Sequence, residues 1–160
     1  MSRPLDPLIQ IIAGAGDIEL HEVDIENLAG TGMLTKDAVS RIHDEYMLSV
    51  PGAASALILV AAGEHNRAAV YNGWRGAIYV FRRGANGADL ALIDAFEGIA
   101  SYEQFDHIYL ASGDGGLALL ANKAKQLGIG LTVVTQRGGK SWRLNGFPSI
   151  HLTNNLGVIK

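Results

Sequence analysis

Cysteine is absent from this chain. Its absence removes disulfides, thiolate zinc sites and thiol nucleophiles, and it is compatible with the reducing cytoplasm in which we expect the protein to work. Basic character is also missing, because the formal net charge is −3 and only 18% of the residues are charged. The chain therefore lacks the overall charge of a nucleic-acid binder, and any such binding would need a local basic patch.

Long apolar runs and several familiar motifs are missing as well. No run approaches the ~18 residues of a membrane span, and the first residues lack the basic-then-apolar pattern of a signal peptide, so we expect no membrane partner. There is no P-loop lysine, no GxGxxG and no G-x-S-x-G elbow, which argues against a phosphate loop and a serine hydrolase. The histidines show no ligand spacing for zinc; they are His21, His43, His65, His107 and His151.

The length and the hydrophobic content of the chain are those of one packed domain. It has 160 residues, 48% of them hydrophobic, and its 20 glycines lie mostly at turns between apolar runs. That length suits a single domain with a sizeable core. We expect residues 1–17 to be an N-terminal extension and residues 18–160 to form the domain.

Apolar patterning predicts alternating strands and helices. The predicted strands span residues 18–25, 55–62, 77–81, 107–111, 129–135 and 149–152. The predicted helices span residues 36–47, 64–71, 88–100 and 117–127, with a helical turn at 138–144. Thr35 is the expected N-cap of the first helix and Gly128 the expected stop of the last. This alternation with short links predicts an α/β fold with a mostly parallel sheet.

Three aspartates lie at or beside the carboxyl ends of predicted strands. Asp24 is at the end of the first strand, Asp114 directly follows a later one, and Asp89 starts the helix after the strand between them. In open α/β sheets these ends meet where the strand order reverses. Carboxylates that gather there repel one another unless a cation compensates, and Mg²⁺ or Mn²⁺ prefers such oxygen ligands. The alternative for each aspartate is a helix cap or a turn.

Three further polar residues are candidates for the same site. Asp94 follows Asp89 by five positions, about 140° around an ideal helix, so it reaches the crevice only if Asp89 precedes the helix; otherwise it lies on a solvated face. Asn27 and Ser112 are candidates to orient a phosphate or a metal-bound water. An Asx-turn and a tight turn beside Asp114 are the corresponding structural alternatives.

Basic residues follow several predicted strand ends, on the expected side of the aspartates. They could neutralise the phosphates of RNA, with Trp142 offering a stacking face for an unpaired base, or they could form an ordinary solvated face. These candidates are Arg82, Arg83, Arg137, Lys140 and Arg143.

Together the acidic motifs resemble the NYN domains, which are PIN-like ribonucleases. The resemblance is carried by Val-Asp-Ile-Glu-Asn-Leu at 23–28, Gly-Ala-Asp-Leu-Ala-Leu-Ile-Asp at 87–94, Ser-Gly-Asp-Gly at 112–115, and the helix and strand at 117–135. It implies a three-layer α/β/α sandwich with a PIN/flavodoxin-like central sheet. The implied activity is endonucleolytic cleavage of single-stranded or structured RNA by Mg²⁺ or Mn²⁺.

The family's ligands fall on Asp24, Asp89 and Asp114, with Asp94 as a fourth. The family commonly has another acidic residue two positions after the turn aspartate, where this chain has Gly116. That departure keeps a second hypothesis open, a catalytically silent PIN-like module that binds RNA or a protein partner. A receiver-type phosphoryl domain is a weaker alternative, because Thr135-Gln136-Arg137 lacks the expected lysine. A homodimer is also left open.

Overall fold

The computed structural model describes residues 19–84, 92–93, 105–136 and 138–152, and the statements below concern these. The expected N-terminal extension and most of the predicted helix at 88–100 lie outside the described residues. So do three predicted site residues, Asp89, Asp94 and Arg137.

One parallel sheet forms the centre of the molecule. Its strands are β1 (Leu20–Asp24), β2 (Leu57–Gly63), β3 (Ile78–Arg82), β4 (His107–Ala111), β5 (Gly130–Gln136) and β6 (Ser149–Leu152). The strand order is β3-β2-β1-β4-β5-β6, and every pairing is parallel. The chain is thus wound outward in both directions from β1, which puts the switch point between β1 and β4. A flavodoxin-like sheet also has its switch point beside its first strand; here one more strand lies beyond β2.

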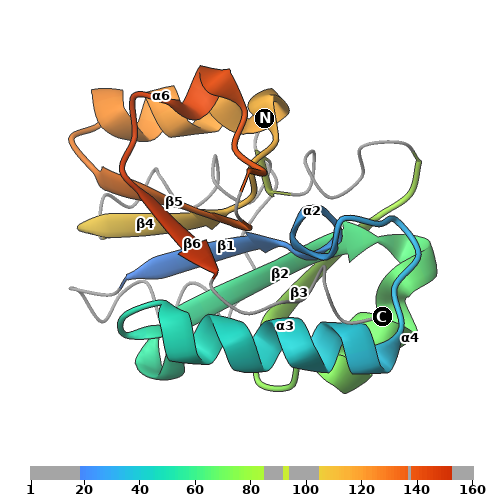
Figure 1. The fold of residues 1–160 in the computed structure, drawn as a ribbon. Helices are drawn as coiled ribbons and strands as arrows, with labels where there is room; N and C mark the ends of the chain where they lie inside the picture. The colour runs from blue at the N-terminus through green and yellow to red at the C-terminus, as the bar shows by residue number, and fades with distance from the viewer. Residues whose placement is uncertain (1–18, 85–91, 94–104, 137, 153–160) are drawn as a thin grey trace, which may run out of the picture.

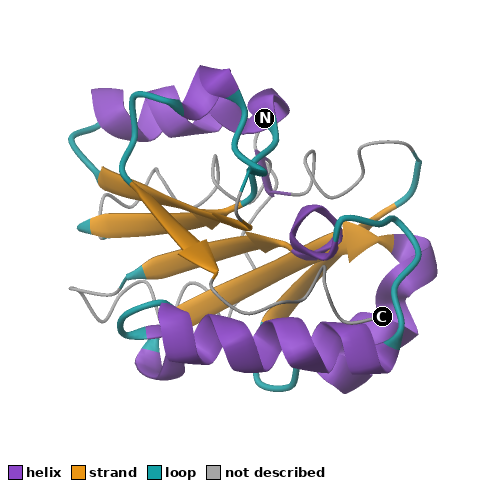
Figure 2. Cartoon of the chain, in the orientation of Figure 1, coloured by secondary structure: helices purple, strands orange, loops and turns teal. Residues whose placement is uncertain are grey.

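Helices cover both faces of this sheet. Helices α3 (Lys36–Ser49) and α4 (Arg67–Gly73) pack on one face, and α6 (Ala118–Gln126) packs on the other (Figures 1 and 2). The predicted three-layer α/β/α arrangement is therefore confirmed. No helix in the described ranges is long and apolar enough to cross a bilayer.

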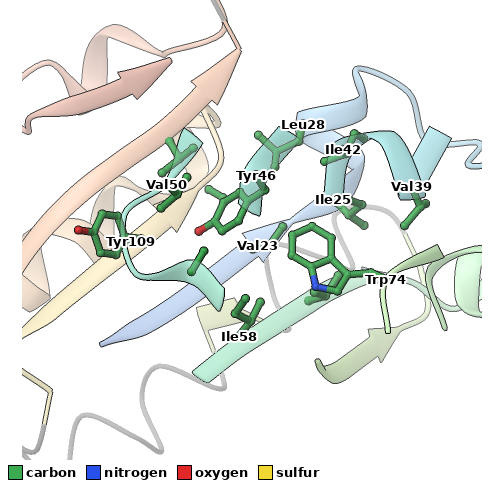
Figure 3. Packing of buried hydrophobic residues seen from close by; sticks show 14 of the residues in the cluster. Val23, Ile25, Leu28, Val39, Ile42, Tyr46, Val50, Ile58, Trp74 and Tyr109 are labelled. Atoms are coloured by element: carbon green, nitrogen blue, oxygen red, sulfur yellow. The ribbon is translucent and has the colours of Figure 1, made fainter. Parts of the chain in front are cut away.

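Two apolar cores lie between these layers. The core under α3 and α4 includes Val23, Tyr46, Val60 and Trp74, which Figure 3 shows in part between the helices and the sheet. The core under α6 includes residues of opposite parity on the same strands, such as Leu59 and Leu110, together with Leu20, Leu120 and Val133. Strand β2, covered on both faces, accordingly reads as a continuous apolar run, whereas the equally buried β1 contains His21, Glu22 and Asp24.

Two predicted helix ends are confirmed. The Thr35 side chain accepts a hydrogen bond from Ala38 N at 3.1 Å and so caps α3. Gly128 has φ +77°, a left-handed conformation that glycine adopts without a Cβ penalty, directly after the C-cap of α6.

A one-turn helix, α2 (Ile25–Ala29), lies where the sequence predicted the end of a strand and a loop. Strand β1 ends at Asp24, one residue earlier than predicted, because the Asp24 carboxylate accepts a hydrogen bond from Asn27 N and caps this helix. The predicted helical turn at 138–144 is narrower as well, a 3₁₀ turn at Trp142–Leu144.

Candidate functional site

The switch point brings two of the predicted aspartates to neighbouring strands. Asp24 is the last residue of β1, and β1 pairs with β4 through Val23 and Ala111. Ser112 and Asp114 directly follow β4. The predicted adjacency of the two strands is confirmed.

A single hydroxyl connects the two acidic segments. Asp24 is only 4% exposed, and its Oδ2 accepts a hydrogen bond from Ser112 Oγ at 3.2 Å. Ser112 Oγ in turn accepts from Asp114 N, also at 3.2 Å. The Asp24 carboxylate is therefore held from both sides, by Asn27 N at Oδ1 and by Ser112 at Oδ2.

Asn27 holds the turn that follows β4. Its side-chain Oδ1 accepts a hydrogen bond from Gly113 N at 2.8 Å. On the other side of the turn, Ser141 N donates to Gly113 O at 2.8 Å. A Cβ at position 113 would lie 1.7 Å from Gly139 O, so only glycine fits in this gap. The turn is clamped between α2 and residues 139–141.

Helix α2 also ties the ends of other strands together. Glu26 Oε2 accepts from Gly63 N at 2.8 Å, at the end of β2, and from Asn66 Nδ2 at 2.6 Å. From the end of β5, Gln136 Nε2 donates to Leu28 O. Glu26 was not among the predicted site residues, although it lies inside the motif that carried Asp24 and Asn27.

Asp114 caps the turn that leads into α6. Its Oδ1 accepts from Gly116 N at 2.8 Å, at the start of a 3₁₀ helix, Gly115–Leu117. Both Asp24 and Asp114 thus have the capping role that was their structural alternative. Across the part of the chain that the structure describes, no three His, Cys, Asp or Glu side chains are arranged to hold a metal ion. The predicted third and fourth ligands, Asp89 and Asp94, are outside that part.

The predicted basic residues have different surroundings. Arg82 ends β3 and Arg83 follows it, and both are exposed at the carboxyl edge of the sheet. Arg143 lies at the Asp114 turn, since a Cβ on Gly115 would be 3.1 Å from its Cδ. Its guanidinium carbon is 5.5 Å from the centre of the Trp142 ring.

Lys140 is engaged within the protein. Its Nζ donates to Phe147 O at 2.7 Å and to Ser149 Oγ at 2.5 Å, at the start of β6. These bonds tie the segment that contacts the Gly113 turn to residues 147–149, so the predicted phosphate-binding ammonium group of Lys140 is engaged within the protein.

Two buried ionisable residues of β1 were missed by sequence reasoning. Glu22 is fully buried, and among the described residues neither of its carboxyl oxygens has a hydrogen-bond partner. Burial raises its pKa to about 8. Strand alternation puts Glu22 on the same face as Asp24, between Leu59 and Leu110 of the neighbouring strands.

His21 lies on the opposite face of β1, in the core under α3. Its Nδ1 is 2.6 Å from Tyr46 Oη, and its ring stacks on Tyr109 with 4.5 Å between centroids. Burial, reinforced by the nearby His107, lowers its pKa to about 4. His21 is therefore a neutral core residue at physiological pH.

Comparison with known proteins supports the fold and no more. No family model and no curated protein matches the chain. The crystal structure of a protein of unknown function from Vibrio parahaemolyticus is similar, with a TM-score of 0.54 and 17% sequence identity. The match covers 88% of this chain and 95% of that one. The shared fold is the α/β sandwich described above.

Proposed function

We propose that the protein hydrolyses RNA phosphodiester bonds with the help of a divalent cation at the carboxyl edge between β1 and β4. The observation that carries this proposal is the chain of contacts from Asp24 through Ser112 to Asp114 at the switch point. Ligands of open α/β sheets bind there. The resemblance of the three acidic motifs to NYN domains supports the same activity, and the lack of cysteine fits work in the cytoplasm.

The side chains at this edge fit Mg²⁺ or Mn²⁺ in their chemistry. Asp24 and Asp114 offer hard carboxylate oxygens, and Mg²⁺ in proteins is often held by one or two carboxylates, several waters and the substrate phosphates. Asp89 and Asp94 are the further ligands predicted from the sequence. When bound, such a cation lowers the pKa of its water and stabilises the charge that develops on the phosphate.

The other residues at this edge would position the aspartates or neutralise the phosphates of the RNA. Hydrogen bonds from Asn27 N and Ser112 Oγ stabilise the Asp24 carboxylate and fix its orientation. Asn27 Oδ1 fixes the turn that carries Asp114. Arg82, Arg83 and Arg143 would bind phosphates of the RNA on either side of the scissile bond.

A catalytically silent module that binds RNA is the second candidate. One observation favours it: oxygens of the Asp24 and Asp114 carboxylates already accept hydrogen bonds from other groups of the protein. Both oxygens of Asp24 accept hydrogen bonds, and Gly116 supplies a backbone N–H to Asp114 where the family has another acid. In that case the aspartates would serve only as caps.

The decisive experiment is cleavage of end-labelled single-stranded and hairpin RNA by the full chain, with Mn²⁺, with Mg²⁺ and with EDTA. We expect cation-dependent cleavage that falls roughly 10- to 100-fold or more in Asp24→Asn and Asp114→Asn, since even second-shell changes at metal sites have effects of that size. Asp106→Asn is the matched control, an exposed aspartate just before β4, at the amino end of the strand that Asp114 follows. Unchanged cleavage in both site variants would contradict the proposal.

A thermal melt separates the two candidates independently of activity. A cation that binds only the folded chain must raise its melting temperature. We expect Mn²⁺ to stabilise the wild type and Asp106→Asn but not Asp24→Asn. RNA binding without a Mn²⁺ shift and without cleavage would establish the silent module instead.

A further inference from the structure

A surface groove lies between α4 and β3, and its lining residues are not part of the proposed cleavage site. Its volume is about 520 Å³, within the usual range for small-ligand pockets and too small for a folded partner. Residues of α4 and of the edge strand β3 line it, namely Arg67, Ala68, Tyr71, Asn72, Tyr79 and Phe81. We call this the α4–β3 groove.

Three of the residues that line the groove are aromatic. Tyr79 and Phe81 project from the same face of β3, and their rings are parallel within 4° at 6.1 Å. The Tyr71 side chain is 57% exposed. The centroids of the Tyr71 and Tyr79 rings are 5.5 Å apart and their planes are inclined by 53°, so the two rings are not stacked on each other. The Tyr79 hydroxyl donates to Trp74 O, which anchors that ring. The groove thus presents fixed, partly exposed ring surface.

An ion pair lies at the Phe81 end of the groove. The Arg67 guanidinium lies 4.6 Å from the centre of the Phe81 ring and pairs with Glu64 at 2.8 Å. Arg82 is in register with Gly63, so Arg83 lies at the level of Glu64. The hydrogen bond from Arg67 lowers the pKa of Glu64, and the charge of Arg83 lowers it further.

A third arginine lies near Tyr79. The exposed Arg75 follows Trp74, whose carbonyl oxygen accepts the hydrogen bond from the Tyr79 hydroxyl. Burial raises the pKa of Tyr79 most, and the charge of Arg75 acts in the opposite direction. With Glu64 engaged by Arg67, the exposed Arg75 and Arg83 leave the surroundings positive. An occupant should therefore combine a flat apolar ring with negative charge.

The groove lies close to the proposed site of cleavage. Asp24 is in register with Ala61, and Ala61 with Val80, so Phe81 lies one residue beyond the level of Asp24. Two strand spacings separate β3 from β1, about 10 Å. Phe81 and Asp24 project from opposite faces of the sheet, and a bound strand would cross its carboxyl edge beside Arg83.

We propose that the α4–β3 groove binds an unpaired nucleobase of single-stranded RNA, with Tyr71 and Tyr79 as the stacking surface and Arg75 and Arg83 on the flanking phosphates. Stacking of bases on aromatic rings beside a basic track is the usual way in which proteins hold single strands. The inference rests on the proposed function for the identity of the polymer. It assigns single-stranded RNA as the substrate class.

The test is binding of a labelled short oligouridylate to the full chain in EDTA, measured by fluorescence anisotropy, so that cleavage plays no part. Tyr71→Ala should weaken binding by roughly 5- to 100-fold, the usual effect of removing one stacked ring. Tyr71→Phe should bind like the wild type, because it keeps the ring. Leu119→Ala is the matched control, an exposed apolar residue of α6 on the other face of the sheet.

Two further arms test the role of the base. An abasic strand of the same length should bind as weakly to the wild type as the oligouridylate binds to Tyr71→Ala. Ultraviolet crosslinking of a 5-iodouridine strand should attach to Tyr71 or Tyr79. Equal binding of Tyr71→Ala and wild type, equal binding of the abasic strand, or no RNA binding at all would overturn the proposal.

Two results distinguish failure of this inference from failure of the proposed function. If RNA binding depends on Tyr71 but no cation-dependent cleavage occurs, RNA binding in the groove is supported and the nuclease activity is contradicted. If cleavage depends on Asp24 but RNA binding does not depend on Tyr71, the nuclease activity is supported and RNA binding in the groove is contradicted.

Discussion

Ser112 Oγ donates a hydrogen bond to Asp24 Oδ2 although the two residues are 88 positions apart in the chain. Because the same oxygen accepts from Asp114 N, one buried hydroxyl holds the last residue of β1 against the turn after β4. This small side chain therefore links residues that are distant in sequence, alongside the hydrogen bond from Gly113 N to Asn27 Oδ1.

Ser112→Ala should destabilise the fold by about 1–3 kcal/mol, since it leaves a buried carboxylate oxygen with one partner fewer. It should also lower RNA cleavage, because the orientation of Asp24 and of the Asp114 turn both depend on the hydroxyl. Urea unfolding and the cleavage assay measure the two effects. Ser55→Ala, at an exposed serine whose hydroxyl donates to Gly52 O, is the control. Equal stability of Ser112→Ala and wild type would show that the link is dispensable.

The Gly113 turn supplies a steric prediction. A Cβ at position 113 would meet the Gly139 backbone at 1.7 Å, a distance that no side-chain rotation relieves. Gly113→Ala should therefore separate the turn from residues 139–141 and cost about 1–3 kcal/mol or more, as overpacking does. The midpoint of urea unfolding measures the loss.

Gly146→Ala is the matched control for that variant, because no atom of the described residues lies within 4 Å of its added Cβ. It should leave the unfolding midpoint nearly unchanged. A Gly113→Ala protein as stable as Gly146→Ala would mean that the turn moves freely, and that its clamped geometry has no role in placing Asp114.

The adjacency of Asp24 and Asp114 could be predicted because parallel strands bring their carboxyl ends to one edge. The bonds that fix the two residues could not. Helix α2 is a single turn, too short to leave a helical period, and its cap, Asp24, lies in a run that alternates as a strand does. The clamp by Asn27 and Glu26 depends on that hidden turn.

The solvent exposure of side chains on the strands could not be predicted from the local sequence pattern either. The run from Ile18 to Ile25 alternates apolar and polar residues, which suits a strand with one solvated face, yet β1 is the central strand and both its faces are covered. Glu22 is buried for that reason. Conversely, Tyr79 and Phe81 read as core residues, but β3 is an edge strand and leaves them partly exposed.

His21 and Glu22, two of the buried ionisable residues of β1, make stability depend on pH in opposite directions. The pKa of His21 is lowered from 6.5 to about 4 in the fold, so its contribution is present above pH 6.5 and is lost as the pH falls through 4. The pKa of Glu22 is raised from 4.5 to about 8, so its contribution is present below pH 4.5 and is lost as the pH rises through 8. Between pH 6.5 and 8, of these two only Glu22 contributes a slope.

Glu22→Leu should stabilise the protein, because an apolar side chain replaces a buried carboxyl that has no hydrogen-bond partner among the described residues. The gain should increase from pH 5 to pH 8, by at most about 1.4 kcal/mol per pH unit, and level off above. The free energy of unfolding in urea at several pH values measures it. Glu22→Gln is the matched variant, since it keeps the unpaired polar group and removes only the titration. Its unfolding should lose the slope of the wild type between pH 6.5 and 8 without the full gain of the leucine. A glutamine variant that keeps that slope would show that Glu22 is not its source.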